Sequence, residues 1–364
     1  MILKFDYEIM IIGGGPAGIS TWLHLNKYAQ DLASNTILIE KEKYPRDKLC
    51  GGAIGSWGQD ILKQLDIQIN APSIKIKKTE YRFKKENFCI KEPGFLKIFR
   101  RIELDYELAK NAVNRGLTLN QNERIQEISY KNKGIIVKTN KKKYKVKILV
   151  GADGALSTVR SLMNSVTKPR FATGIEIFAP VNPRYDAEFD DKKAILDFTS
   201  ITEGLQGYTW HFPCIKDNVP YMNHGIFDSK ININKPRANI RNILTNKLQS
   251  REINCKPSSW SGHPIPWLNK NTTISQPNII LIGDAAGIEP LLGGGIHLAL
   301  SYGDIAALAI LDAFKTDDYN FDSYREKLET HIVGKYIKKL TYLANEVYNE
   351  NMDILEAIRK IFKK

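Results

Sequence analysis

A glycine-rich turn near the start of the chain constrains the fold more than any other feature. The apolar run 7–12 leads into GGGPAG, and residues 16–28 then follow a helical pattern. A second apolar run, 36–40, ends in an acidic residue and completes a β-α-β unit. We therefore expect a parallel α/β sheet of the Rossmann type, with a dinucleotide-binding turn after its first strand.

The three glycines of this turn each have a physical reason. Gly13 permits the tight turn, Gly15 lets the backbone approach a pyrophosphate, and Gly18 lets the helix pack on the strand. Glu40 lies 22 residues after Gly18, about where a carboxylate accepts hydrogen bonds from ribose hydroxyls. An ordinary tight turn is the alternative, and the fingerprint alone does not separate FAD from NAD.

Two later motifs make that distinction, GADGALSTVR at 151–160 and GDAAGIEPLLGGGIHLA at 283–299. Together with GGGPAG they resemble the para-hydroxybenzoate-hydroxylase-like flavoprotein superfamily, whose segments occur in this order. The resemblance implies that FAD is the cofactor and that Asp284 holds its ribityl chain. It also implies that Asp153 and Gly154 line the pyrophosphate region.

The glycines before the apolar helix 294–314 agree with a flavin site. Unpaired backbone N–H groups at Gly293, Gly294 and Gly295 would face an anionic flavin edge, unless the loop merely caps a core helix. Arg101, in RRIELDYEL, matches the arginine of the superfamily's RxxLDxxL helix, which reaches toward the cofactor. An exposed surface arginine is the alternative.

Within the superfamily, PRDKLCGG at 45–52 and YTWHFP at 208–213 resemble the geranylgeranyl reductase family. That family carries P-x-x-K-x-C-G-G soon after the ribose-binding acid and YxWxFP in its substrate sheet, and the resemblance covers most of residues 5–315. The chain departs from the family pattern at Ala53 and at 214–220. These departures weaken the assignment of a substrate and leave the cofactor assignment intact.

The family reduces isolated carbon–carbon double bonds of polyprenyl chains, so the resemblance implies hydride transfer from reduced flavin and a proton for the second carbon. Cys50 matches a family residue near the substrate, and we expect it to position the alkene or take part in protonation. A small buried hydrophobe is its alternative. Trp210 and Phe212 share one strand face, where they line an acyl-chain tunnel or fill a core.

The predicted site residues therefore fall into two groups. The catalytic candidates are Cys50, Trp210 and Phe212. The cofactor-binding candidates are Gly13, Gly15, Pro16, Ala17, Gly18, Glu40, Lys41, Arg46, Lys48, Cys50, Gly51, Arg101, Asp153, Gly154, Gly283, Asp284, Pro290, Gly293, Gly294, Gly295 and Ile296. His263 and His297 show no catalytic partner, and we expect His297 to have a packing role. No metal site is expected, because the four cysteines are spread without ligand spacing.

The order of the motifs predicts a discontinuous organisation. The expected units are an FAD-binding domain at 1–71, 100–165 and 276–316, a small strand insertion at 72–99, an antiparallel β-sheet substrate domain at 166–275 and a C-terminal helical segment at 317–364. No second dinucleotide fingerprint is visible. Electrons would therefore come from transiently bound NAD(P)H or from a ferredoxin.

The formal net charge of +13 favours anionic neighbours. Lysines at 75–101 and 131–147 alternate with apolar residues, as solvent-facing side chains on amphipathic strands do, so no nucleic acid is expected. Charged residues and glycines interrupt the apolar region 278–314, which argues against an uninterrupted membrane span. We expect a cytoplasmic protein, soluble or peripheral at the anionic inner face of the membrane.

Three other functions compete with the reductase. An aromatic-ring monooxygenase needs the same fold and differs in what the reduced flavin meets. A flavin-dependent halogenase fits less well, because a WxWxIP segment is expected where this chain has Tyr208 and Phe212. A flavin-containing membrane-surface protein without turnover is the third, suggested by the charge and the basic C-terminal helices.

Overall fold

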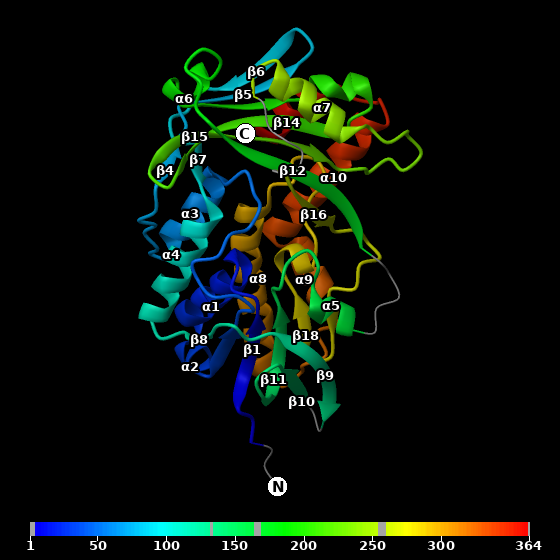
Figure 1. Cartoon of the computed structure of the whole chain (residues 1–364). Helices are drawn as coiled ribbons and strands as arrows, with labels where there is room; N and C mark the ends of the chain where they lie inside the picture. Colours follow the sequence, from blue (N-terminus) through cyan, green and yellow to red (C-terminus); the bar gives the residue numbers. More distant parts are fainter. Residues whose placement is uncertain (1–3, 132–133, 164–168, 254–259, 363–364) are drawn as a thin grey trace.

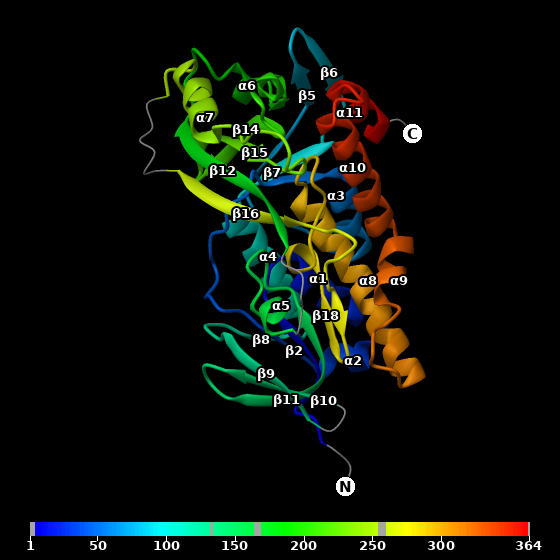
Figure 2. The same cartoon turned by 90° about the vertical axis from the view of Figure 1, so that its right-hand side faces the viewer.

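The computed structural model describes residues 4–131, 134–163, 169–253 and 260–362. It places an α/β unit beneath a second sheet, and the C-terminal helices run along one side of both (Figures 1 and 2). The mixed α/β class predicted from the sequence is confirmed.

Parallel strands form the centre of the lower sheet, as the first glycine turn predicts. Its main path runs β17 (Ser275–Gln276), β18 (Ile279–Leu281), β11 (Lys143–Gly151), β1 (Tyr7–Ile12), β2 (Thr36–Ile39) and β8 (Thr118–Asn120). The strands from β18 to β8 are parallel, and β17 pairs antiparallel at one edge. A hairpin of β9 (Ile125–Lys131) and β10 (Gly134–Thr139) extends β11. The glycine turn therefore follows directly after the buried C-terminal end of β1, a central strand of the sheet.

Helices pack on the lower sheet and bring small residues into contact. They are α1 (Pro16–Tyr28), α2 (Gln30–Ser34), α3 (Ser56–Gln64), α4 (Arg101–Asn114), α5 (Thr158–Leu162) and α8 (Gly295–Thr316). Helices α1 and α8 cross closely, because a Cβ on Gly303 would lie 2.4 Å from the Ser20 Oγ. Among the described helices, α8 alone has the length and hydropathy of a membrane span, and 72% of that stretch is buried inside the molecule. This is the burial of a core helix.

Seven strands in the described part of the chain form the upper sheet. Their order is β16 (Ser261–Trp267), β12 (Arg170–Pro180), β15 (Val219–Asp228), β14 (Gly207–Lys216), β13 (Lys193–Asp197), β5 (Lys78–Phe83) and β6 (Glu86–Ile90). The sheet is antiparallel, as predicted, except that β13 and β5 pair in parallel. The short elements α6 (Ala187–Asp190), η1 (Thr199–Glu203) and α7 (Ile240–Gln249) accompany it.

The predicted insertion 72–99 does not stand as a separate unit. Its strands β5 and β6 extend the upper sheet, whereas β4 (Ser73–Lys75) and β7 (Leu96–Phe99) pair with β3 (Ala53–Gly55). The reason is burial, because Tyr81 and Ile98 belong to the same hydrophobic core as Trp210. This stretch therefore packs into the core of the upper unit.

The C-terminal segment is helical and connects the two units. Helices α9 (Tyr324–Thr330), α10 (Ile332–Tyr348) and α11 (Ile354–Phe362) rise from beside α8 to the upper sheet (Figure 2). Tyr336 packs against the cores of both units, and α11 contacts β5 and β6. The end of the described chain thus lies close to the strands of the 72–99 stretch.

Candidate active site

A cavity of about 830 Å³ lies where the lower unit, the upper sheet and the C-terminal helices meet. Most of the predicted site residues line it: Gly13, Gly15, Pro16, Ala17, Glu40, Lys41, Arg46, Lys48, Cys50, Gly51, Arg101, Asp153, Gly154, Trp210, Phe212, Asp284, Gly293, Gly294, Gly295 and Ile296. Gly18, Gly283 and Pro290 do not line it. The motifs scattered along the sequence thus converge on one space.

The first glycine turn has the geometry of a phosphate site. A Cβ on Gly13, at φ +105°, would lie 2.4 Å from the Ala152 carbonyl oxygen, so the turn packs against the end of β11. A Cβ on Gly18 would lie 2.0 Å from the Gly13 carbonyl oxygen, which gives Gly18 a packing role. Gly15 caps α1 without a side-chain hydrogen bond, so the first N–H groups of the helix remain available for a phosphate.

Glu40, at the end of β2, is held in a fixed position at the edge of the cavity. Its carboxylate accepts hydrogen bonds from the backbone N–H of Gly14 at 2.8 Å and of Glu42 at 3.1 Å. The Arg46 guanidinium lies 3.2 Å from it. Because each carboxylate oxygen has two lone pairs, capacity remains for a ribose hydroxyl. This arrangement fits the adenosine end of a dinucleotide.

Arg101 is not the exposed surface residue of the alternative interpretation. Its side chain is 5% exposed, and it donates two hydrogen bonds, of 2.6 and 2.7 Å, to the Asp105 carboxylate one turn along α4. Burial acts to lower the pKa of Arg101, but the Asp105 carboxylate outweighs it and the pKa is raised. Arg46 also binds Asp105, at 3.0 Å. Two fixed cations therefore stand beside the glycine turn, where a pyrophosphate needs them.

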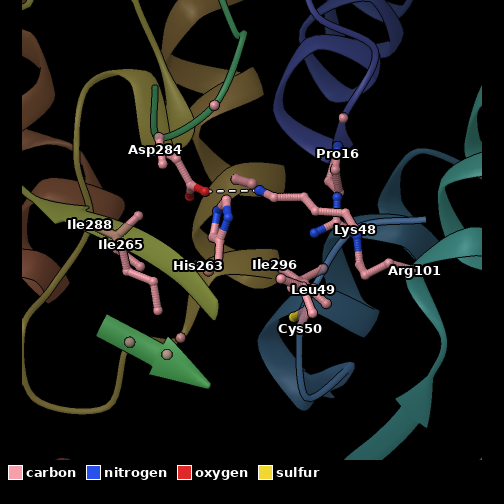
Figure 3. A pocket seen from close by; sticks show the side chains of 18 of the residues that line it. Pro16, Lys48, Leu49, Cys50, Arg101, His263, Ile265, Asp284, Ile288 and Ile296 are labelled. Atoms are coloured by element: carbon pink, nitrogen blue, oxygen red, sulfur yellow. Dashed lines mark hydrogen bonds and ion pairs between the residues drawn. The ribbon is translucent and has the colours of Figure 1, made fainter. Parts of the chain in front are cut away.

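An ion pair joins two predicted cofactor residues across the cavity. The Lys48 Nζ lies 2.9 Å from the Asp284 Oδ2, with His263 close to the pair (Figure 3). Burial acts to raise the pKa of Asp284, but the Lys48 ammonium outweighs it, so the pKa lies below its usual range. Burial lowers the pKa of His263 to about 4, which leaves that imidazole neutral. Asp284 is thus an ionised acceptor for hydroxyl groups such as those of a ribityl chain.

Asp153 lines the cavity, yet its carboxylate is engaged elsewhere. It accepts hydrogen bonds from the Ser157 hydroxyl at 2.5 Å and from the backbone N–H groups of Thr158 and Val159 at 2.7 and 3.0 Å. These contacts fix the N-terminus of α5. Gly154, at φ +82°, has no atom within 4 Å of an added Cβ and leaves room beside the glycine turn. Backbone atoms therefore face this part of the cavity.

The glycine loop before α8 corrects one expectation. Its N–H groups are not all unpaired, because the buried carboxylate of Glu289 accepts hydrogen bonds from Leu291, Leu292 and Gly294 at 2.7–2.9 Å. This role of Glu289 was not predicted, because its only signal in the sequence is an acidic residue inside an apolar segment. The N–H groups available to a flavin edge are those of the first turn of α8, from Gly295 onward.

The two family-specific motifs meet on the upper side of the cavity. A Cβ on Gly51 would lie 3.2 Å from the Phe212 ring and 3.4 Å from the Trp210 Nε1, so the PRDKLCGG loop lies directly against β14. Burial raises the pKa of the neighbouring Cys50, which keeps its thiol protonated. Both aromatic rings are buried and line the cavity. They therefore form part of a wall and not only of a core.

Several cavity residues were missed because they come from segments without motifs. Glu176 on β12 accepts a hydrogen bond from the Cys50 backbone N–H at 3.1 Å. The apolar end of the cavity uses aromatic side chains of the 72–99 stretch and the C-terminal helices: Tyr81, Phe95, Tyr336 and Phe362. His297 also lines the cavity, with its ring centroid 5.4 Å from that of Trp57, and burial lowers its pKa to about 4, in keeping with a packing role.

Within the described residues no group of three or more His, Cys, Asp or Glu side chains is arranged to hold a metal ion. Cys255, one of the four cysteines of the sequence analysis, lies outside the described residues.

Comparison with known proteins agrees with this geometry. The chain is 25% identical to digeranylgeranylglycerophospholipid reductase 3 of Methanosphaera stadtmanae, over 96% of this chain and 89% of that protein. It is 26% identical to digeranylgeranylglycerophospholipid reductase of Methanococcus aeolicus, over 93% and 85%. These names agree with the resemblance seen in the sequence.

Solved structures share the fold. A geranylgeranyl bacteriochlorophyll reductase-like protein of Thermoplasma acidophilum superposes with a TM-score of 0.71 at 20% identity, over 98% of this chain and 96% of that one. The halogenase PltM in complex with FAD gives 0.72 at 17% identity, over 96% and 77%. A family model described as an FAD-binding domain matches residues 6–327. The chain therefore belongs to this FAD-binding family and is an FAD-dependent oxidoreductase.

Proposed function

We propose that this flavoprotein saturates carbon–carbon double bonds of a prenyl-type apolar substrate. The observation that carries the proposal is the lining of the cavity, which is charged around the glycine turn and apolar in a second part, here called the apolar arm. Aromatic and aliphatic side chains line this arm: Trp57, Tyr81, Phe95, Leu96, Leu196, Tyr208, Trp210, Phe212, Phe227, Tyr336, Ile361 and Phe362. An isoprenoid chain matches such a wall, because it buries apolar surface and requires no hydrogen bonds.

The polar atoms of two wall residues are already paired. The Tyr208 hydroxyl donates to the Leu292 carbonyl oxygen at 2.5 Å, and the Trp210 Nε1 donates to the Asn223 Oδ1 at 2.9 Å. These two residues therefore contribute mainly apolar ring surface to the arm. A substrate with a phenol or carboxylate would leave its own polar groups without these partners, which supports an alkene over an aromatic acid.

When bound, reduced FAD supplies a hydride, and the chain must supply orientation, exclusion of water and a proton. The apolar arm excludes water from the alkene. Cys50 lies where the loop that lines the cofactor end meets the aromatic strand, with a protonated thiol. We assign it the role of positioning the alkene at the boundary between the two parts of the cavity.

NAD(P)H or a ferredoxin is our proposed electron donor, because the sequence has one dinucleotide fingerprint and FAD accounts for it. A cytoplasmic location, with peripheral contact at the anionic inner membrane face, is proposed on a different observation. Ile332 and Tyr342, each 59% exposed, flank three exposed lysines on α10: Lys335, Lys338 and Lys339. Tyr336 of the same helix lines the apolar arm, so a lipid substrate would enter beside this surface.

The test is anaerobic photoreduction of the purified yellow protein, followed by addition of a digeranylgeranyl glycerophospholipid. We expect flavin reoxidation and a product that has gained two hydrogen atoms for each reduced bond, measured by mass spectrometry. Rapid oxygen consumption with NADPH and an aromatic substrate would instead indicate a monooxygenase. Salt-sensitive vesicle binding with neither reaction would indicate a membrane-surface protein without turnover.

A further inference from the structure

The upper sheet contributes a buried carboxyl group to the site. Glu176 lies on β12, is 5% exposed and lines the cavity. Within the described residues, no Lys, Arg or His nitrogen lies within 4.0 Å of its carboxylate oxygens. By contrast, Glu80 on β5 is equally buried and contacts both Lys78 and Arg82. The environment of Glu176 therefore differs from that of a structural ion pair.

Hydrogen bonds fix the orientation of this carboxyl group. The Trp210 indole N–H can only donate, and it donates to the Asn223 Oδ1 at 2.9 Å. The Asn223 Nδ2 then donates to the Glu176 Oε2 at 3.0 Å, while the Cys50 backbone N–H donates to the Oε1 at 3.1 Å. Both oxygens must therefore accept. A glutamine at this position would turn an NH₂ group toward one of these donors.

The charged and titratable groups near Glu176 come from several elements. They are Asp47 and Cys50 in the loop before β3, Arg100 before α4 and Cys214 on β14. Arg100 forms ion pairs with three carboxylates, those of Asp47, Glu103 and Asp217, at 3.3–3.6 Å, and not with Glu176 among the described contacts. Burial raises the pKa of Glu176, against the two hydrogen bonds it accepts. The surroundings therefore shift this carboxyl group toward its neutral form.

We propose that Glu176 is the acid that gives a proton to the substrate alkene next to Cys50. The inference rests on the proposed function and names the proton source for that reaction. The O–H bond of the carboxylic acid breaks, and the π electron pair of the alkene forms a C–H bond with this proton. The other carbon receives the hydride that reduced FAD supplies. The resulting carboxylate, stabilised by the N–H groups of Cys50 and Asn223, regains a proton from solvent.

The first experiment needs no turnover. Burial also raises the pKa of Glu289 and Asp153, so the band of Glu176 is identified by difference. The infrared difference between FAD-loaded wild type and Glu176→Gln at neutral pH should contain the C=O stretching band of a buried carboxylic acid, shifted in deuterium oxide. The matched variant Glu80→Gln, in a carboxylate outside the cavity lining, should retain this band. An unchanged band in Glu176→Gln would overturn the assignment.

The second experiment follows alkene reduction in a single turnover. Glu176→Gln should slow it by about 100-fold or more, as loss of a general acid does. The wild-type rate should be highest below the raised pKa of Glu176 and fall as the pH rises through it, and the Gln variant should lack this dependence. Glu176→Asp should restore part of the rate, which a residue that only maintains the fold would not explain. FAD content reports folding in each variant.

The outcomes separate the two proposals. If the wild type reduces no prenyl lipid, the proposed function fails and the role of Glu176 in it fails too. If the wild type reduces the lipid and Glu176→Gln does so at the same rate and with the same pH profile, only the role of Glu176 fails.

Discussion

The two ends of the cavity are built in different ways. The dinucleotide end uses backbone turns and fixed charges, with Glu40, Arg46, Asp105 and Arg101 joined in one chain of ion pairs. The apolar arm uses side chains alone, with rings such as Tyr81 and Phe362 packed 5.6 Å apart. The dinucleotide end should tolerate few changes in backbone conformation. The second tolerates changes in side-chain size, and such changes should alter which substrate fits.

This contrast indicates which part of the cavity determines substrate specificity. A dinucleotide has the same phosphates and ribose in every enzyme that binds it, so the turn that holds it is confined to a few geometries. An apolar chain is recognised by the volume of the cavity, and several segments that lie far apart in the sequence each line part of that cavity. Changes at the two ends should therefore have separable effects on cofactor retention and on substrate choice.

The largest effect is expected at the glycine turn. Gly18→Ala would place a Cβ 2.0 Å from the Gly13 carbonyl oxygen, so α1 must shift away from β1. We expect a loss of about 3 kcal/mol in the free energy of unfolding, measured with denaturant, together with loss of FAD. Gly262→Ala on β16 is the control, because its nearest neighbour would lie 3.8 Å away, and it should change stability by less than about 0.5 kcal/mol. Equal stability of the two variants would contradict the packing role of Gly18.

The next effect concerns the flavin itself. Asp284→Ala removes the ionised acceptor after β18 and leaves the Lys48 ammonium without its partner. We expect FAD to bind about 100-fold more weakly, which corresponds to the loss of about two charge-assisted hydrogen bonds. Fluorescence titration of the apoprotein with FAD measures this change. Retention of FAD with wild-type affinity would show that the ribityl assignment is wrong.

The local fold around the glycine turn was predicted well because its signals are local. The turn, the helix 16–28 and Glu40 lie within one β-α-β unit, and the helix was found with the predicted bounds. Local patterns could not reveal that Asp153 binds the N-terminus of α5 or that Glu289 uses the N–H of Gly294. Those contacts depend on how loops close in three dimensions.

The apolar arm was predicted only in part, and the reason is its long-range assembly. Trp210 and Phe212 were identified by strand alternation, but Tyr81 and Phe362, which line the same cavity, come from segments far apart in the sequence. The sequence alone indicated a separate strand insertion at 72–99, because pairing between β5 and β13 joins residues more than a hundred positions apart. No local signal records such a pairing.

A smaller effect is expected at the far end of the arm. Phe362→Ala removes a ring that packs 5.4 Å from Phe95 and 5.6 Å from Tyr81. We expect the KM for a long prenyl lipid to rise about tenfold, because apolar contact worth about 1.4 kcal/mol is lost, while FAD affinity stays unchanged. Lys360→Ala, on the exposed side of the same helix, is the control. If Phe362→Ala weakened FAD binding instead, the two ends of the cavity would not be separable.

The smallest expected effect is a pH dependence of the stability that the Lys48–Asp284 ion pair contributes. The Lys48 ammonium holds the pKa of Asp284 below its ordinary value of 3.8, so the pair stabilises the folded apoprotein above that pH. This contribution is lost as the pH falls through the lowered pKa of the folded state. Lys48→Met should reduce apoprotein stability at pH 6 by about 1 kcal/mol and change it less once the pH falls below the lowered pKa of Asp284. Thermal unfolding of both proteins across this range measures the difference. A stability difference that does not depend on pH would show that Lys48 stabilises the apoprotein through packing of its methylene chain and not through its charge.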